Sequence, residues 1–203
     1  RLIEKLVPRI EKLKVGPYTS GQDVDYGPVV TAAAKQNILN LVQTGVDQGA
    51  TLVVDGRDFN LQGYEDGFFV GPHLFDNVTP DMDIYTKEIF GPVLCTVRAG
   101  NYEEALGLAM DHEYGNGTAI FTRDGDAARD FANRINVGMV GINVPIPVPL
   151  AYHTFGGWKK SVFGDLNQHG PDAFKFYTRT KTVTARWPSG IKQGGEFNFK
   201  AMD

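Results

Sequence analysis

The stretch that decides the fold is residues 93–143, VLCTVRAGNYEEALGLAMDHEYGNGTAIFTRDGDAARDFANRINVGMVGIN. Short apolar runs alternate in it with amphipathic segments, and short links join them. The expected elements are a strand at Val93–Val97, a helix at Tyr102–Met110, a strand at Thr118–Thr122, a helix at Asp126–Ile135 and a strand at Met139–Asn143. The apolar middle of each strand is typical of strands buried on both faces of a parallel sheet. The stretch therefore predicts a layered α/β fold.

The part of the chain before this stretch adds further helices and strands. Residues 2–13 carry an apolar helical stripe that needs a covering partner, and Pro8 must kink this helix or start its second half. Residues 31–50, TAAAKQNILNLVQTGVDQGA, predict a second helix that leads into a short strand at Thr51–Val54. The aromatic and β-branched run GFFVGPHLFDNV, residues 67–78, has strand character. Helix and strand thus alternate from the start.

The chain changes character after residue 143. Residues 145–170, PIPVPLAYHTFGGWKKSVFGDLNQHG, have no helical or strand period, and a loop of this length in a compact domain is usually functional. With Tyr152, Phe155 and Trp158, the stiff proline-rich start could wall an apolar substrate tunnel. A rigid surface loop that covers the sheet end is an equally good interpretation. The adjacent glycines 156 and 157 predict a close approach of the backbone to a neighbouring element.

The end of the chain predicts an unpartnered strand. In residues 174–187, FKFYTRTKTVTARW, threonines alternate with larger side chains, which is a strong β pattern. Because an isolated strand is not stable in water, its partner is expected in another region or another subunit. The expected organisation is a main domain at 1–170, a strand segment at 171–187 and a polar tail at 188–203.

Composition indicates an ordinary soluble globular protein. The 203 residues are 42% hydrophobic and 22% charged, and the formal net charge of −4 comes with interspersed signs. No basic run of five or more suggests nucleic acid as a partner, and no apolar run approaches the roughly 18 residues of a membrane span. A single cysteine excludes an internal disulfide and fits a cytoplasmic setting. The chain begins at Arg1 without an initiator methionine, so we expect a piece of something longer.

The single cysteine and the four histidines give little support to a catalytic or metal site. Cys95 lies in the apolar strand PVLCTV, where a thiol is most often a small buried hydrophobe with a raised pKa, although a nucleophilic role is the alternative. The histidines are scattered and show no ligand spacing, so no metal is expected. Among them only His153, in the proline loop, lies in a plausible pocket.

The segment KEIFGP, residues 87–92, places a carboxylate and an aromatic ring close together. On an extended segment Glu88 and Phe90 share a face, because strand side chains alternate with period two. Such a pair suits a nucleotide, since a carboxylate accepts hydrogen bonds from both hydroxyls of a ribose while the ring packs on a heterocycle. Taken alone, the spacing favours the simpler interpretation of a solvated glutamate beside a core phenylalanine.

Several motifs together resemble the aldehyde dehydrogenase superfamily. KEIFGPV is similar to its E-x-F-G-P signature. The stretch YGNGTAIFTRDGDAARDFANRINVGMVGINVPIPVP, followed by FGGWKKSVFGD, resembles the CoA-acylating methylmalonate-semialdehyde dehydrogenase branch of the superfamily. The likeness extends from the first helix to FYTRTKTVTARW and implies the parallel-sheet, three-layer catalytic domain of that family.

The resemblance also implies roles for particular residues. It assigns Glu88 to the ribose of the nicotinamide half of NAD and Phe90 to the nicotinamide itself. The segment from Pro145 to Phe155 would line the aldehyde tunnel, with Phe155 as a substrate-pocket residue. Residues 178–187 match the strand that joins subunits of a homo-oligomer, as a dimer or tetramer. The implied partners are a methylmalonate or malonate semialdehyde, NAD and CoA, and the implied compartment is the cytoplasm, or the mitochondrial matrix in a eukaryote.

This sequence departs from the family pattern in one important respect. The family's catalytic cysteine lies in a G-Q-x-C type motif just before the helix that opens this chain, and Cys95 does not occupy its place. The domain that binds most of the dinucleotide and the asparagine that helps hold the oxyanion also belong to a portion upstream. The resemblance therefore implies no catalytic residue within this chain and no turnover by the chain alone. A different aldehyde substrate, or a non-catalytic folded module that assembles through its terminal strand, are the alternatives.

Overall fold

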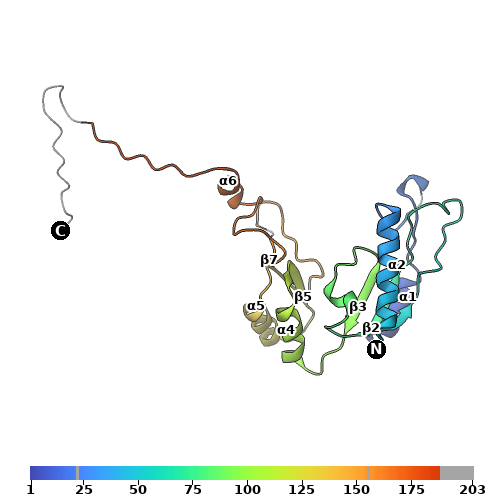
Figure 1. Cartoon of the computed structure of the whole chain (residues 1–203). Helices are drawn as coiled ribbons and strands as arrows, with labels where there is room; N and C mark the ends of the chain where they lie inside the picture. The colour runs from blue at the N-terminus through green and yellow to red at the C-terminus, as the bar shows by residue number, and fades with distance from the viewer. Residues whose placement is uncertain (22, 155, 188–203) are drawn as a thin grey trace. The chain divides into compact units, whose positions relative to one another are not determined.

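The computed structural model describes residues 1–21, 23–154 and 156–187, which form two compact units (Figure 1). The first unit comprises residues 1–113 and 123–136. The second unit comprises residues 114–122 and the described residues from 137 onward. The polar tail predicted at 188–203 lies outside the described residues.

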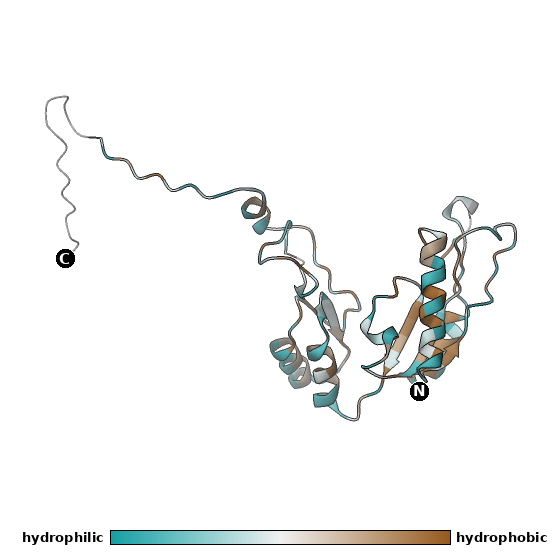
Figure 2. Cartoon of the chain, in the orientation of Figure 1, coloured by the Kyte–Doolittle hydropathy of each residue, from teal (hydrophilic) through white to brown (hydrophobic). Residues whose placement is uncertain are grey.

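The first unit contains a three-stranded sheet and most of the helices. Its elements are α1 (Leu2–Ile10), the 3-10 helix η1 (Tyr18–Ser20), α2 (Ala32–Asp47), β1 (Thr51–Val54), β2 (His73–Val78), α3 (Asp83–Thr86), β3 (Val93–Val97), α4 (Tyr102–Asp111) and α5 (Gly125–Arg134). The strand order is β1-β2-β3, with β1 antiparallel and β3 parallel to β2. In Figure 2 the strands of this sheet are coloured as hydrophobic, whereas α2 shows both hydrophobic and hydrophilic residues along its length. The middle strand is therefore the best candidate for the centre of the core.

The core of the first unit forms where α2 packs on β2. Thr31 caps the start of α2, because its Oγ1 accepts a hydrogen bond from the amide of Ala34 at 3.1 Å. The buried residues of α2 then recur at helical spacing and lie in one hydrophobic cluster with β2 and α3. The members of that cluster with no more than 2% exposure are Ile38, Val42, Phe75 and Val78. Helix and strand therefore bury a common interior.

A bulge in β2 lets two of its residues reach the same core. The register of β2 against β3 shifts between Phe75 and Val78. Between them Asn77 has a φ of 56°, in the left-handed region that asparagine tolerates better than most residues. Strict alternation would send Phe75 and Val78 to opposite faces, and the bulge brings both into the cluster with α2.

The second unit contains two short two-stranded sheets and one helix. Its elements are β4 (Tyr114–Gly115), β5 (Gly117–Ile120), β6 (Met139–Ile142), β7 (Trp158–Lys159) and α6 (Asp172–Tyr177). Strand β5 pairs with β6 in parallel from Gly117 opposite Met139 to Ile120 opposite Ile142. Strand β4 pairs with β7 antiparallel. Because β7 follows the proline-rich loop, this second pairing ties the loop back to the sheet region.

The predicted α/β class and most of the predicted helices and strands are confirmed, and two of the strand pairs are parallel as expected. Strands β1 and β3 have the predicted bounds, and α2, α4, α5 and β6 begin and end within three residues of theirs. The described strands form three sheets, in which the parallel pairs β2–β3 and β5–β6 are separate and β1 is antiparallel. Apolar periodicity predicts that a segment is a buried strand but contains no information about which strand lies beside it.

The first helix is shorter than predicted and only partly covered. It passes through Pro8 and ends at Ile10, although the apolar pattern continued to Leu13. None of its residues is fully buried, and Leu2 is 67% exposed. None of the helices in the described residues is long and apolar enough to cross a membrane.

The terminal segment corrects the prediction of a strand that starts near residue 174. Residues 172–177 form helix α6 instead, so Phe174 and Phe176 lie on a helix, and both are exposed. Residues 178–187 join no ladder with the other described residues. A strand is defined by hydrogen bonds to a neighbour, and no described segment supplies one, so the subunit-joining role of 178–187 stays a prediction.

Two glycines allow a close backbone contact in the first unit, and we predict that neither tolerates alanine. A Cβ built on Gly56 would lie 2.5 Å from the carbonyl carbon of Gly71, and one on Gly71 would lie 2.6 Å from the carbonyl oxygen of Gly56. Because both neighbours are backbone, Gly56→Ala and Gly71→Ala should each lower the free energy of unfolding by about 1–3 kcal/mol. Urea denaturation of the purified variants measures this change.

Gly107 provides the matched control for this prediction. It lies within α4, and a Cβ built there has no heavy atom within 4 Å. Gly107→Ala should raise the free energy of unfolding by roughly 0.5–1 kcal/mol, because alanine loses less entropy than glycine in a helix. Equal effects of all three substitutions would contradict the close contact.

Candidate functional site

The segment KEIFGP lies between α3 and β3 and is anchored by its apolar and glycine residues. Ile89 is partly buried and packs against the cluster formed by α2 and β2. Gly91 lies so close to α2 that a Cβ built on it would be 2.6 Å from Cδ1 of the buried Ile38. Any larger residue at position 91 would push the segment off the helix. The packing of Ile89 and Gly91 thus fixes the position of the segment against the core.

A backbone hydrogen bond attaches the segment to the sheet. The amide of His73, the first residue of β2, donates to the carbonyl oxygen of Pro92 at 2.9 Å. The next residue, Val93, is the partner of His73 in the parallel register. The amide of Val93 also donates to the carbonyl oxygen of Gly91 at 2.8 Å. The end of the segment is therefore continuous with the β2–β3 pairing.

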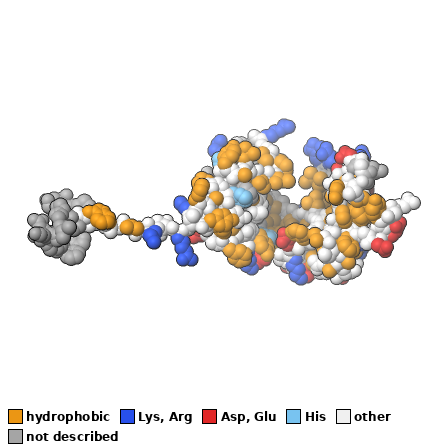
Figure 3. Space-filling view, turned by 90° about the horizontal axis from the view of Figure 1, so that it is seen from above, with side chains coloured by type: hydrophobic (Ala, Val, Ile, Leu, Met, Phe, Trp, Pro, Cys, Tyr) orange, Lys and Arg blue, Asp and Glu red, His pale blue; other side chains and the backbone are white. Residues whose placement is uncertain are grey.

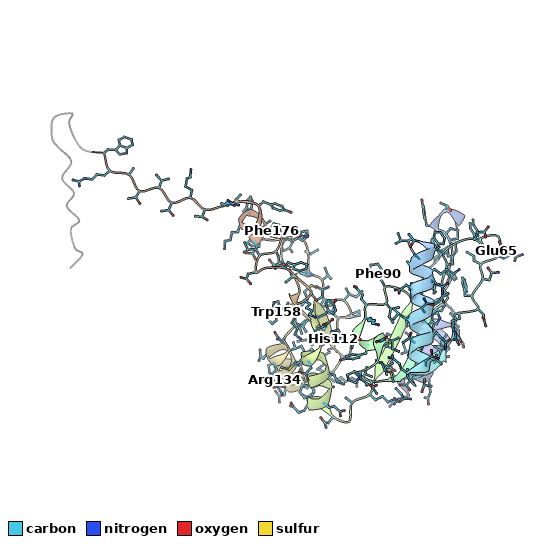
Figure 4. The ribbon with its side chains drawn as sticks, in the orientation of Figure 1. Glu65, Phe90, His112, Arg134, Trp158 and Phe176 are labelled. Carbon is cyan, nitrogen blue, oxygen red and sulfur yellow. The ribbon has the colours of Figure 1, made fainter. Side chains whose placement is uncertain are left out.

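Glu88 and Phe90 are exposed on either side of the inward-facing Ile89. Phe90 is 79% exposed, and Figure 4 shows it on the loop between α3 and β3. Glu88 is exposed and forms no hydrogen bond or ion pair with any described residue. Its neighbour Lys87 is engaged elsewhere, because its Nζ donates to Oδ2 of Asp83 at 2.8 Å. The carboxylate and the ring are thus both available to a ligand.

The backbone at Phe90 is unusual for an aromatic residue. Its φ of 57° lies in the left-handed region, which bulky side chains rarely occupy because Cβ then crowds the backbone. Strained residues of this kind occur most often at ligand-binding sites. Lys87 is extended, but the turn at Phe90 means that the predicted strand alternation does not continue through the motif. The exposure of Glu88 and Phe90 results instead from the anchoring of Ile89 and Gly91.

Cys95 has the environment expected of a structural thiol. It lies in the middle of β3, is partly buried, and packs against the cluster of α2 and β2. Its Sγ lies 3.7 Å from the carbonyl oxygen of Ile84, at hydrogen-bond distance for sulfur. Burial raises the pKa of the thiol to about 11, so almost no thiolate is present at neutral pH. The structure supports the interpretation of Cys95 as a core residue.

The proline-rich loop presents an apolar face outward. Pro147 and Pro149 are half-buried, and Pro147 packs close to Gly141 of β6. Five aliphatic and aromatic side chains beside the prolines are exposed by 48–72%. They are Val144, Ile146, Val148, Leu150 and Tyr152. Hydrophobic side chains at the molecular surface are coloured orange in Figure 3. This arrangement is compatible with the wall of an apolar tunnel, whereas Phe155, the predicted pocket residue, lies outside the described residues.

The two glycines after residue 155 make the close approach that the sequence predicts. A Cβ built on Gly156 would lie 1.8 Å from Oδ1 of Asn167, and one built on Gly138 would lie 2.0 Å from the carbonyl oxygen of Gly156. A Cβ built on Gly157 would lie 2.4 Å from Cβ of Ser161. The loop therefore folds tightly over the start of β6, and side chains at these positions would separate the two.

Sequence reasoning missed a cavity of about 370 Å³ in the second unit beside these glycines. Its lining includes the amides of Asn116, Asn167 and Gln168 and the rings of Phe163 and Phe176. Figure 4 labels Phe176, from α6, and Trp158, from β7. The lining residues come from the link between β4 and β5, from the second half of the loop and from α6, and they carry no spacing motif, so the sequence does not predict them. The amides offer hydrogen-bond donors and acceptors, the rings offer apolar surface, and His169 also lines the cavity.

The first unit contains a second cavity of about 360 Å³, beside Tyr85. The hydroxyl of Tyr85 donates to the carbonyl oxygen of Leu108 at 3.1 Å, and its ring meets that of His112 edge to face at 5.2 Å. Asp111 and Glu113 also line the cavity. Within the described ranges, however, no three histidine, cysteine or acidic residues come together in a way that would hold a metal ion.

Comparison with known proteins identifies the family to which these features correspond. The model of the aldehyde dehydrogenase family matches residues 1–183. A malonate-semialdehyde dehydrogenase of Pseudomonas aeruginosa is 58% identical over 202 residues, which are 99% of this chain and 40% of that protein. A mitochondrial protein of Drosophila melanogaster, named as a probable acylating methylmalonate-semialdehyde/malonate-semialdehyde dehydrogenase, is 50% identical over 91% of this chain and 35% of its own length.

A solved structure agrees with these matches. A protein of Sinorhizobium meliloti named as a methylmalonate-semialdehyde dehydrogenase, crystallised with NAD, is 72% identical and superimposes with a TM-score of 0.90. The match covers 95% of this chain and 39% of that one. The chain therefore spans about two fifths of the length of the proteins that it resembles.

The environment of Cys95 predicts a slow reaction with thiol reagents. A pKa of about 11, against the ordinary value of 9.0, leaves roughly 100-fold less thiolate at pH 8. Labelling of the folded chain by iodoacetamide should therefore be at least about 100-fold slower than labelling of the urea-unfolded chain. Mass spectrometry of time points measures both rates, and fast labelling of the folded chain would restore the nucleophile interpretation.

Proposed function

The chain belongs to the aldehyde dehydrogenase family, and on this basis we propose that it is part of an NAD-dependent, CoA-acylating semialdehyde dehydrogenase. The observation that carries the proposal is the anchored KEIFGP segment, which leaves an unpaired carboxylate at Glu88 and an exposed ring at Phe90 within this family's signature. The proposed substrates are malonate and methylmalonate semialdehyde, because the relatives are named for them.

The residues present fit the nicotinamide half of NAD. Two hydroxyls of a ribose are hydrogen-bond donors, and Glu88 has a carboxylate without a partner among the described residues. The ring of Phe90 is accessible to a ligand rather than packed in the core, since Phe90 is 79% exposed. When bound, NAD supplies the acceptor for a hydride from the aldehyde carbon. The role of Glu88 is to fix the ribose, and that of Phe90 is to limit where the attached ring can lie.

The chain contributes positioning rather than a nucleophile. Covalent aldehyde oxidation needs a thiolate, and the single cysteine of this chain is a core residue with a pKa raised to about 11. We propose that the exposed apolar residues of 144–152, with Phe155, wall the path of the aldehyde. Transfer of the acyl group to CoA is proposed from the relative whose name specifies an acylating enzyme.

Assembly into a homo-oligomer is the second part of the proposal. Residues 178–187 retain the alternating pattern of a strand and join no ladder within the described chain. A segment with this pattern can pair with the sheet edge of another subunit. The alternative of a purely non-catalytic assembly module rests on this same segment and gives no reason for the free carboxylate at Glu88.

We predict that the 203-residue chain by itself does not oxidise semialdehydes. No described residue supplies a thiolate, so malonate semialdehyde, NAD and CoA incubated with the chain should yield no NADH above the rate without protein. The measurement is the absorbance of NADH over time. Turnover by the chain alone would show that the proposed division of roles is wrong.

The role of Glu88 is tested by Glu88→Gln in a full-length polypeptide that carries this chain. Loss of two charge-assisted hydrogen bonds should cost about 1.5–3 kcal/mol, which corresponds to a decrease of roughly 10- to 100-fold in kcat/KM for NAD. Steady-state kinetics with varied NAD measures the change. Glu65→Gln is the control, because Glu65 is also exposed and only accepts a hydrogen bond from the amide of Gly63 at 2.8 Å. Unchanged kinetics of Glu88→Gln would remove its assigned role.

A further inference from the structure

His73 is buried at the point where the KEIFGP segment joins the sheet. Only 1% of its surface is exposed, and it is the first residue of β2. Its amide holds the carbonyl oxygen of Pro92, and its register partner in β3 is Val93. Neither nitrogen of its imidazole ring forms a well-directed hydrogen bond within the described part of the chain. A titratable ring thus lies, without a strong partner, under the attachment point of the segment.

The charged groups that act on this ring are already engaged with each other. The two charged residues that interact electrostatically with the His73 ring are Asp55 and Arg57, on the loop after β1. The guanidinium of Arg57 binds both carboxylate oxygens of Asp55, with Nε at 2.9 Å from Oδ1 and 3.0 Å from Oδ2. Asp76, farther along β2, is likewise bound by the guanidinium of Arg98. A protonated His73 would therefore find no free carboxylate.

Burial favours the neutral form of this ring. Loss of solvent lowers the pKa of His73, and this effect outweighs the opposing influences of Asp55 and of the Gly71 backbone. If the first pair of the β2–β3 ladder opens, the ring reaches water and regains its ordinary pKa near 6.5. The open form then binds more protons than the closed form, so the closed form loses stability relative to the open form as the pH falls below about 6.5.

We propose that His73 is a positioning residue for the KEIFGP segment, and that it holds the segment in place only while its imidazole ring is neutral. Protonation would leave an unpaired charge in an apolar interior, which is among the costliest arrangements in a protein. Opening of the terminal pair of the β2–β3 ladder, His73 and Val93, exposes the charged ring to water at the lowest cost, because strand ends open more readily than strand centres. That opening breaks the bond from His73 to Pro92, and Glu88 and Phe90 lose their fixed position.

This inference rests on the proposed function only in its consequence for NAD, so its test has two separate readouts. The first is the hydrogen-exchange protection of the His73 and Val93 amides in a full-length polypeptide that carries this chain, measured by NMR from pH 7.5 to 5.5. Protection should fall about tenfold over this range, together with titration of the His73 ring in the same spectra. The second is the KM for NAD, which should rise over the same pH range while kcat changes less.

Three variants make the test specific. His73→Phe and His73→Gln cannot become charged, so protection at residue 93 and the KM for NAD should become independent of pH in whichever of them folds. His112→Gln removes a histidine outside the β2–β3 pair and should retain the wild-type dependence. Protection in the wild type that does not change with pH, or that falls equally in the His73 variants, would overturn the role of His73. Falling protection with a constant KM would leave His73 as the anchor and contradict the proposed contact of the segment with NAD.

Discussion

The pairing of β2 with β3 is the interaction on which the first unit and its candidate site depend. Strand β2 lies between β1 and β3 and packs against α2, and five of its six residues are buried. The pairing begins at His73 and Val93, directly after Pro92. Because proline has no amide of its own, the bond from His73 is the way this end of the segment joins the sheet. Loss of this pair would detach the Pro92 end of the segment from the sheet, while Ile89 and Gly91 still contact the core.

The site residues are placed by their neighbours rather than by their own contacts. Ile89 and Gly91 fix the backbone against the core, and Glu88 and Phe90 remain exposed as a consequence. The proline-rich loop is similar, since Pro147 and Pro149 are partly buried and the aliphatic residues beside them are exposed. In both segments anchored residues and exposed residues lie next to each other along the chain. Substitutions of the exposed members should therefore change function more than folding.

The sequence predicted local structure well where a pattern was long and consistent. The β1 and β3 bounds were correct, and the α2 and α4 predictions were close, because helical spacing or continuous apolar character extended over most of each element. The prediction failed at residues 174–177, where an apparent alternation is in fact a helix. Pro171 and Asp172, at the start of α6, are residues typical of a helix start, whereas the threonine pattern that follows is typical of a strand.

By itself the sequence determined the α/β class and the family signature around Glu88, favoured a buried structural thiol at Cys95, and predicted the close approach at Gly156 and Gly157. Only the tertiary structure decided which strands are neighbours, the left-handed backbone of Phe90 and the amide-lined cavity of the second unit. It also buried the ring of His73, whose backbone amide donates to the carbonyl oxygen of Pro92. The physical reason is that periodicity and motifs are properties of consecutive residues. Pairing, burial and pKa shifts depend on groups that meet only after the chain has folded.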